Sequence, residues 1–193
     1  MDMLLTSENE LIEATKGGDS NAFGELVKLY EKKIYSYALG MLSNPDDAFD
    51  IAQDTFMKAY RSIAFFKGES SFYTWLYTIC RNCCYDFIKK RDRNRRHTIS
   101  LFQYENDDDG TIIEIPDSTN DPEALYEKKR LRKIIFDAIQ TLSDNHREII
   151  LLRDVEGLSY EEISAAMGIS EGTVKSRLSR ARTKLQTILK DKL

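Results

Sequence analysis

The sequence is poor in the residues that mark turn-dense, secreted and membrane-spanning proteins. Its 193 residues include only three prolines, nine glycines and three cysteines, whereas 31% are charged, and this composition favours helices over a turn-rich β protein. No stretch approaches the roughly 18 consecutive apolar residues that a membrane-spanning helix needs. The opening MDMLLTSENE has no basic region followed by a long apolar run, so we expect no signal peptide. These absences predict a soluble, cytoplasmic chain of one large domain or two small ones.

The sequence also lacks the patterns of common catalytic and metal sites. It contains neither a P-loop nor a G-x-S-x-G motif. Cys80, Cys83 and Cys84 fall in one expected helix, but His97 and His146 are distant in sequence and no second cysteine pair accompanies them. We interpret these cysteines as small buried apolar residues, and a redox-sensing Cys80–Cys83 pair is the alternative. We expect no enzyme activity, no metal, no cofactor and no small-molecule substrate.

Charge is distributed unevenly along the chain, whose formal net charge is −4. Residues 1–95 are nearly neutral, with a net charge of −1, and residues 96–123 carry −7. Residues 124–193 carry +4, so an acidic middle hides a basic C-terminal end. Asymmetry of this kind indicates separate functional blocks and permits a nucleic-acid-binding segment in an acidic protein.

The stretch from Leu158 to Leu189 predicts a helix-turn-helix. Ser159 and Glu162 have the spacing of a capping box at the start of a helix. Gly168 can adopt the positive φ that ends such a helix, and Ser170 can cap the next one. In this motif the second helix normally enters the DNA major groove.

The second helix of this motif has two distinct faces. Its apolar stripe, which we expect to face the core, consists of Val174, Leu178, Ala181, Leu185 and Leu189. The opposite side, which suits contacts to phosphates and base edges, presents Lys175, Ser176, Ser179, Arg180 and Thr183, flanked by Arg177, Arg182 and Lys184. A solvated amphipathic helix is the alternative for such a face alone, but the preceding capped helix and turn favour DNA binding.

Three helices are expected in the first 62 residues, and the third has a notable second face. The first ends at Gly17 and Gly18, the second starts at Asp19 or Ser20, and the third starts at Pro45. We expect the third helix to bury Phe49, Ala52, Phe56, Tyr60 and Ile63. Its other stripe, which is either solvated surface or a docking face for a basic or amphipathic partner helix, contains Asp50, Asp54, Met57 and Arg61, with Gln53 between the two faces.

A fourth helix, from Phe72 to about Arg95, follows a loop with two adjacent aromatic residues, Phe65 and Phe66. We expect its core face to contain Phe72, Trp75, Leu76, Ile79, Cys83 and Phe87. Its other side suits an unpaired base and presents Thr78, Arg81, Asn82, Tyr85 and Lys89. The helix ends in the basic run KKRDRNRRH, which either follows a phosphate backbone or solubilises a helix end.

Residues 98–121 lack helical periodicity and predict an acidic, flexible linker between two small helical domains, residues 1–97 and 122–193. Helices are expected from Pro122 to Leu142 and from Asp144 to Val155, before the helix-turn-helix. The fold class is therefore all-α, with about four helices in the C-terminal domain.

These segments together resemble a sigma factor of bacterial RNA polymerase, of the extracytoplasmic-function (ECF) group of the sigma-70 family. PDDAFDIAQDTF (residues 45–56) is similar to the family's core-polymerase-binding segment. FKGESSFYTWL (66–76) with residues 79–82 is similar to its promoter-melting and −10 recognition segment. Leu158 to Leu185 is similar to its −35 recognition motif, which response regulators share. All three in order, across an acidic linker, are specific to this group.

The resemblance implies a role for each face. Four residues would dock on the β′ clamp helices of core RNA polymerase: Asp50, Gln53, Asp54 and Met57. The β subunit of the polymerase would be a second contact. The −10 DNA would be bound by Phe65, Lys67, Ser70, Thr78, Arg81, Asn82, Tyr85 and Lys89. The −35 element would be read by Thr173, Lys175, Ser176, Arg177, Ser179, Arg180 and Thr183. Ser179 stands where some relatives have a bulky residue, so their −35 preference does not transfer.

The resemblance also implies partners beyond core polymerase and promoter DNA. Members of this group are often held inactive by an anti-sigma factor, which is frequently membrane-bound. Two other functions remain open from the residues alone, a free-standing operator-binding regulator and an adaptor that binds proteins through its amphipathic faces.

Overall fold

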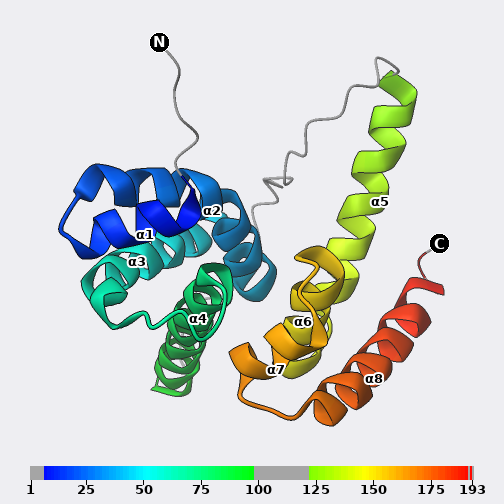
Figure 1. Cartoon of the computed structure of the whole chain (residues 1–193). Coiled ribbons are helices and arrows are strands. Elements are labelled where there is room, and N and C mark those ends of the chain that lie inside the picture. The colour runs from blue at the N-terminus through cyan, green and yellow to red at the C-terminus, as the bar shows by residue number, and fades with distance from the viewer. Residues whose placement is uncertain (1–6, 98–121, 191, 193) are drawn as a thin grey trace.

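The computed structural model describes residues 7–97, 122–190 and 192, and every regular element within these ranges is a helix. Helices α1–α4 form an N-terminal domain and α5–α8 a C-terminal domain beside it (Figure 1). The all-α fold with a C-terminal helix-turn-helix is therefore confirmed. The linker expected at residues 98–121 lies outside the described residues.

The first two helices begin at capping residues. Helix α1 (Glu8–Lys16) starts with a capping box between Ser7 and Glu10. Helix α2 (Ser20–Leu42) starts at Asp19, whose carboxylate accepts the backbone N–H groups of Asn21 and Ala22. Caps of this kind satisfy N–H groups that have no partner inside the helix, so they fix where each helix begins.

Helix α3 (Pro45–Ser62) follows the Asn44 cap and continues into a short 3₁₀ turn, η1 (Ile63–Phe65). The predicted buried face of α3 is wrong at two positions, because Phe49 is 56% exposed and Tyr60 is 41% exposed. The side chains that actually face the core are mostly small: Ala48, Ile51, Ala52, Thr55 and Ala59. Small residues let two helix backbones approach closely, which leaves the bulky aromatics at the rim of the contact.

Helix α4 (Phe72–His97) forms one wall of the N-terminal core. The predicted core residues Phe72, Leu76 and Cys83 are buried, while Trp75 and others lie at the edge of the core. All three cysteines are free and buried, in agreement with their interpretation as apolar residues. A hydrogen bond with Cys80 and burial both raise the pKa of the Cys84 thiol, so this sulfur stays protonated.

The C-terminal domain is built around α8 (Glu171–Lys190), which packs on α5 (Pro122–Gln140), α6 (Asp144–Ile150) and α7 (Tyr160–Met167). The predicted helix 144–155 changes character partway, because α6 passes into a π-helical segment, η2 (Leu151–Val155). The predicted capping box of Ser159 with Glu162 is present, and Gly168 ends α7 with a φ of 65°. Ser170 accepts the backbone N–H of Thr173 and so caps α8, as expected.

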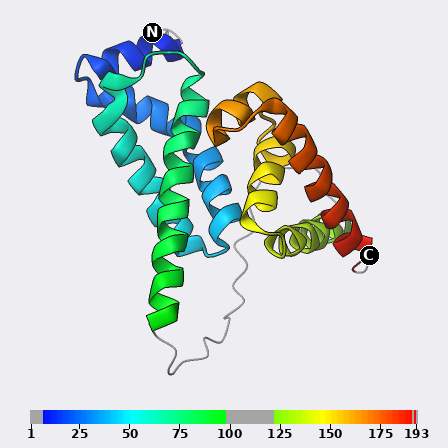
Figure 2. The same ribbon diagram turned by 90° about the horizontal axis from the view of Figure 1, so that it is seen from below.

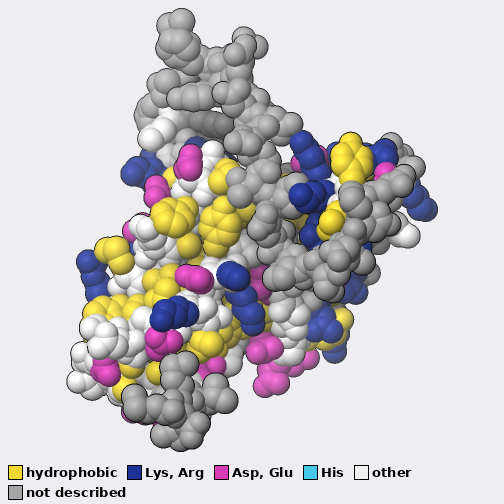
Figure 3. All heavy atoms as spheres, turned by 90° about the horizontal axis from the view of Figure 1, so that it is seen from above, with side chains coloured by type: hydrophobic (Ala, Val, Ile, Leu, Met, Phe, Trp, Pro, Cys, Tyr) yellow, Lys and Arg dark blue, Asp and Glu magenta, His cyan; other side chains and the backbone are white. Residues whose placement is uncertain are grey.

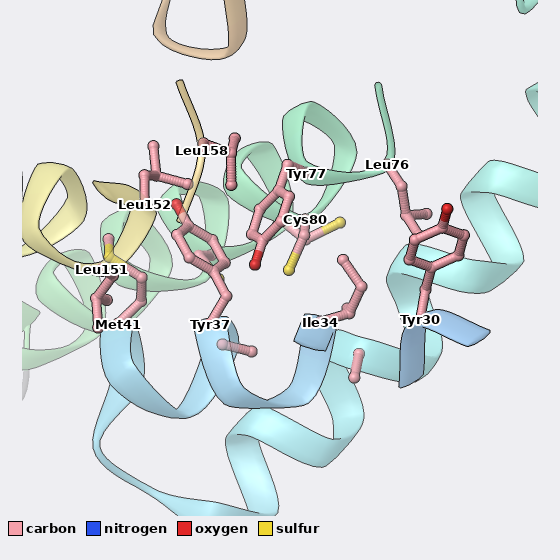
Figure 4. Packing of buried hydrophobic residues seen from close by; sticks show 14 of the residues in the cluster. Tyr30, Ile34, Tyr37, Met41, Leu76, Tyr77, Cys80, Leu151, Leu152 and Leu158 are labelled. Atoms are coloured by element: carbon pink, nitrogen blue, oxygen red, sulfur yellow. The ribbon is translucent and has the colours of Figure 1, made fainter. Parts of the chain in front are cut away.

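The two domains share one hydrophobic core. Leu151, Leu152 and Leu158 of the C-terminal domain pack beside Tyr37 and Met41 of α2 and beside Tyr77 and Cys80 of α4 (Figure 4). Helix α7 lies beside α4 in two perpendicular views (Figures 1 and 2). The sequence did not predict this arrangement, because hydrophobic periodicity identifies a core face without naming the element that covers it.

Within residues 7–97, 122–190 and 192, the helices are too short or too polar to span a lipid bilayer. No three side chains of the metal-binding types gather there in a way that would hold a metal ion.

Candidate nucleic-acid and protein interfaces

The outer face of α8 is open to solvent. Lys175, Ser176, Ser179, Arg180 and Thr183 are all exposed, and Thr173 and Arg177 are half-buried beside them. The Ser176 hydroxyl donates to the carbonyl of Thr173 (3.1 Å) and the Thr183 hydroxyl to that of Ser179 (3.0 Å). These hydroxyl oxygens keep their lone pairs, so they remain able to accept hydrogen bonds. The face therefore presents both cations and acceptors, the combination used to contact phosphates and base edges.

The cations of α8 divide into two groups. The Arg182 guanidinium pairs with the Asp154 carboxylate, with 3.1 Å between Nε and Oδ2, and so holds α8 against η2. Burial lowers the pKa of His146 on α6, and the nearby charges of Lys184, Arg177 and Arg180 lower it further. The exposed face of α8 therefore carries Lys175, which lies 3.9 Å from the Glu171 carboxylate, and Arg180, while Arg182 at its flank pairs with Asp154.

The exposed face of α3 combines carboxylates with an apolar centre. Asp50, Gln53 and Asp54 are exposed, and Met57 is 50% exposed beside them. Phe49 and Tyr60, which sequence reasoning assigned to the core, join this face instead. Spacing contained the signal, because Phe49, Gln53, Met57 and Tyr60 recur at i, i+4, i+8 and i+11.

One view of the surface shows how the two domains differ. In Figure 3 the larger N-terminal part, at the left, carries exposed hydrophobic side chains among acidic and basic ones. Basic side chains prevail on the narrower part at the right. An apolar patch rimmed by charge is typical of a protein-binding surface, whereas a concentration of cations is typical of nucleic-acid binding.

The loop after η1 surrounds a hollow of about 260 Å³, lined by Phe65, Phe66, Lys67, Glu69, Ser70 and Trp75. The Phe65 ring is 79% exposed, while the buried Phe66 ring contacts those of Phe72 and Trp75. The hollow therefore has a rigid aromatic floor and one aromatic side chain at its rim. Three of the predicted −10 residues, Phe65, Lys67 and Ser70, line it together.

The predicted base-binding face of α4 is divided. Asn82 and Lys89 are exposed, whereas Thr78 is half-buried and donates its hydroxyl to the carbonyl of Thr74 (3.0 Å). Asn82 does not line the hollow described above but lies seven residues beyond Trp75, about 10 Å further along the helix. The hollow and Asn82 are thus neighbouring parts of one surface rather than one pocket.

The other two residues of this face, Arg81 and Tyr85, point to the C-terminal domain. Both donate to the carboxylate of Glu148 on α6: Arg81 Nε lies 2.5 Å from Oε1, and the Tyr85 hydroxyl lies 2.8 Å from Oε2. Burial and the Glu148 charge raise the pKa of Tyr85, so its hydroxyl remains a donor. Sequence reasoning missed Glu148, since an isolated glutamate on an amphipathic helix carries no pattern that indicates a buried partner.

Two parts of the chain match models of known protein families. Residues 26–94 match Sigma-70 region 2, and residues 132–185 match Sigma-70, region 4. These ranges contain the α3 face, the loop hollow and the α4 face in the first case and the α8 face in the second.

Two curated proteins with the name "ECF RNA polymerase sigma-E factor" are similar along nearly their whole length. The protein from Haemophilus influenzae is 38% identical over 181 residues, which cover 93% of this chain and 94% of that protein. The protein from Escherichia coli K12 is 36% identical over 177 residues, covering 91% of each.

Solved structures show the same architecture. The sigma factor RpoE of Bartonella quintana, in complex with the anti-sigma factor NepR, matches with a TM-score of 0.69 and 32% identity, over 87% of this chain and 96% of that one. CnrH, in complex with the cytosolic domain of CnrY, has the same fold at 23% identity, with a TM-score of 0.69 over 95% and 97%. From the two matched regions and the full-length relatives it follows that the chain belongs to the ECF sigma factors of RNA polymerase, within the sigma-70 family.

Proposed function

We propose that this initiation factor gives core RNA polymerase its promoter specificity through three separate surfaces. The α3 face binds core polymerase, the α8 face reads the −35 element, and the loop hollow with the α4 face captures the −10 element. The observation that carries this proposal is the presence, in one chain, of an exposed cationic helix-turn-helix face and a second exposed aromatic and polar surface far from it in sequence. The functional division follows residues 1–97 and 122–193, with residues 98–121 between them.

The two DNA surfaces suit different forms of DNA. The α8 face consists of long cations and small hydroxyls on a straight helix, which fits the major groove of a duplex. The loop hollow has an aromatic floor and an exposed ring, and Asn82 can form hydrogen bonds to a base edge. Aromatic platforms beside hydrogen-bonding side chains bind unpaired bases, so this surface is suited to melted DNA.

The α3 face suits a helical partner on core polymerase. An apolar centre of Phe49, Met57 and Tyr60 lies beside the Asp50 and Asp54 carboxylates. A helix with an apolar stripe flanked by cations complements such a face, and the β′ clamp helices would provide it. The C-terminal domain would contact the β subunit.

The chain contributes binding and positioning rather than chemistry. Core polymerase supplies the catalytic site, and this subunit uses no cofactor, metal or small-molecule substrate. We place the protein in the cytoplasm, where its polymerase and promoter partners are. Because a sigma factor 32% identical to this chain is known in complex with an anti-sigma factor, an anti-sigma factor is the proposed regulator and the proposed tether to a membrane.

Reconstituted transcription tests this function. Purified chain and core RNA polymerase would be combined on fragmented genomic DNA, and the transcripts would be mapped by sequencing. We expect transcripts from a small set of start sites that appear only when both proteins are present. A free-standing operator-binding regulator would bind duplex DNA without directing core polymerase, and an adaptor would bind no DNA, so either result would contradict the proposal.

A further inference from the structure

The floor of the loop hollow has a contact that comes from outside the loop and outside α4. The Phe66 ring meets two rings of α4, with centroids 5.6 Å from that of Phe72 and 5.2 Å from that of Trp75. A third contact comes from α1, because the Lys16 ammonium lies over the Phe66 ring, 5.6 Å from its centroid. The face of an aromatic ring carries negative partial charge, so it attracts a cation in this position.

Helix α1 fixes the position of Lys16. This helix packs against α2 and η1 and buries Leu11, Ile12 and Thr15 (Figure 2). Lys16 stands in its last turn, where Nζ lies 2.9 Å from Oε1 of Glu13. The Lys16 side chain is only 26% exposed, so its ammonium is partly removed from water and its attraction to the ring is less weakened by solvent.

The loop between η1 and α4 depends on the Phe66 ring for its position. Among residues 66–71, which form no helix, only Phe66 is buried. Gly68 turns the chain with a φ of 75°, and the neighbouring Phe65 ring is 79% exposed. Contacts of the Phe66 ring therefore decide how firmly the floor and the rim of the hollow are held.

We propose that Lys16 is a positioning residue for −10 capture, whose ammonium fixes the Phe66 ring and so orders the hollow before DNA arrives. The residues that line the hollow all come from the segment 65–75, so Lys16 acts through Phe66 rather than on the DNA. A site that is already ordered binds without the entropy cost of fixing its side chains. This inference rests on the proposed −10 role of the hollow. It extends that role to α1, which precedes the residues 26–94 that match Sigma-70 region 2.

A matched pair of lysines separates this role from a general effect of charge. Lys16→Met keeps an unbranched side chain and removes the cation, and Lys16→Arg restores a cation. Lys28 on α2 is the control, because its Nζ lies 2.8 Å from Oε1 of Glu25 in the same i, i+3 geometry. Across the described residues, no aromatic ring lies beneath the Lys28 ammonium. Lys28→Met therefore removes one positive charge from the same domain without removing a ring contact.

The ion pair of Lys16 is tested apart from its ring contact. Glu13→Gln removes the carboxylate and leaves the ammonium over the Phe66 ring. Because both positions of this pair are at least partly open to solvent, the pair itself contributes little to stability. We expect Glu13→Gln to behave like the unaltered chain.

Two measurements on the full chain test the proposal. Acrylamide quenching follows the emission of Trp75, which lines the hollow and is the only tryptophan of the chain. Fluorescence anisotropy over a series of salt concentrations gives the affinity for a fluorescein-labelled single strand with the −10 segment of a promoter mapped by reconstituted transcription. The −35 duplex of the same promoter is the DNA control, and far-ultraviolet circular dichroism checks that each variant is folded.

We expect Lys16→Met to increase the quenching of Trp75 and to weaken single-strand binding by about twofold to fivefold relative to Lys28→Met, the range that corresponds to one cation–π contact. The salt dependence of binding should equal that of Lys28→Met, because Lys16 touches no phosphate. Lys16→Arg should restore both values, and duplex affinity should not change in any variant.

Each failure has its own signature. Single-strand binding and quenching that are the same in Lys16→Met and Lys28→Met would overturn the proposal. A salt slope lower by about 0.7 in Lys16→Met alone would show that Lys16 contacts a phosphate directly, which also contradicts a positioning role. A loss that Lys16→Arg does not restore would exclude the cation as the cause. If the chain directs no transcription with core polymerase, the proposed function itself fails, and the quenching of Trp75 still decides whether Lys16 orders the hollow.

Discussion

The α8 face and the α4 face both present cations and hydrogen-bonding side chains, yet the free chain treats them differently. On α8, Lys175, Ser179 and Arg180 are all open to solvent. On α4, Asn82 is open, while Arg81 and Tyr85 are bound to Glu148. Two faces with similar side chains can therefore differ in how many of those side chains are free to bind DNA. One candidate DNA-binding surface is open to solvent, and two side chains of the other pair with a carboxylate of the same chain.

The largest effect is expected from changes in the α3 face, through which the chain would bind core RNA polymerase. We expect Asp50→Lys with Asp54→Lys to abolish the pull-down of core RNA polymerase, because the reversed charges would repel the cations of the partner helix. Far-ultraviolet circular dichroism should remain native, since both positions are exposed. Glu25→Lys with Glu31→Lys on α2 reverses the same number of exposed charges and should preserve binding. Retained binding in the first variant would remove the α3 face from the proposal.

Two neighbouring arginines sharpen the description of the α8 face. Arg180→Ala should weaken binding to a mapped −35 duplex by about 1–3 kcal/mol if it reads a base, or lower the salt slope by about one if it contacts a phosphate. Arg182→Ala should change duplex affinity less, because the exposed Arg182 guanidinium is already paired with the Asp154 carboxylate of the same chain. Fluorescence anisotropy over a series of salt concentrations distinguishes these results. Equal losses in the two variants would show that pairing within the protein does not decide which cation binds DNA.

Asn82 tests the part of the α4 face that is open to solvent. We expect Asn82→Ala to reduce open-complex formation on a mapped promoter by ~1–2 kcal/mol, through loss of hydrogen bonds to an unpaired base. Binding of the −35 duplex should not change. Permanganate reactivity of melted thymines measures the first effect and anisotropy the second, with Asp86→Ala, an exposed change on the same helix, as the control. Normal melting in Asn82→Ala would exclude this residue from −10 capture.

The smallest effect concerns His146 on α6, which is half-buried near the cations of α8. Burial and the nearby cations lower the pKa of His146 below its ordinary value of 6.5. Below pH 6.5 the unfolded chain therefore binds a proton that the folded chain resists, so this group lowers the free energy of unfolding as pH falls toward the folded pKa. Urea unfolding at pH 7.5 and pH 5.5 should show a smaller loss of stability in His146→Gln than in the unaltered chain. An equal loss in both would mean that burial and the nearby cations do not lower the pKa of His146 in the folded chain.

Local sequence signals predicted most of the helix boundaries. Asp19, Ser159 and Ser170 each mark a helix start that the structure contains, because a cap depends only on residues within one turn. Gly168 ended α7 as predicted for the same reason. Local chemistry of this kind needs no knowledge of the rest of the fold.

Contacts between distant segments could not be predicted in the same way. Phe49 and Tyr60 were assigned to the core because they are large and apolar, but the alanines of α3 set its distance from α2. Glu148 lies 67 residues from Arg81 in sequence, and nothing in either neighbourhood indicates the other. Gly40 reads as an ordinary helix glycine until Leu151 is found against it. The candidate site was therefore predictable as a set of faces, while its occupation by the chain itself required the structure.

The most direct test of the division between the two DNA surfaces compares the two DNA forms on one promoter. The affinity of the free chain would be measured for the −35 duplex and for the single-stranded −10 segment of a mapped promoter, with Arg180→Ala and with Asn82→Ala. We predict that Arg180→Ala weakens binding of the duplex alone and that Asn82→Ala weakens binding of the single strand alone. Equal changes for both DNA forms in either variant, or no change for either form, would contradict the account.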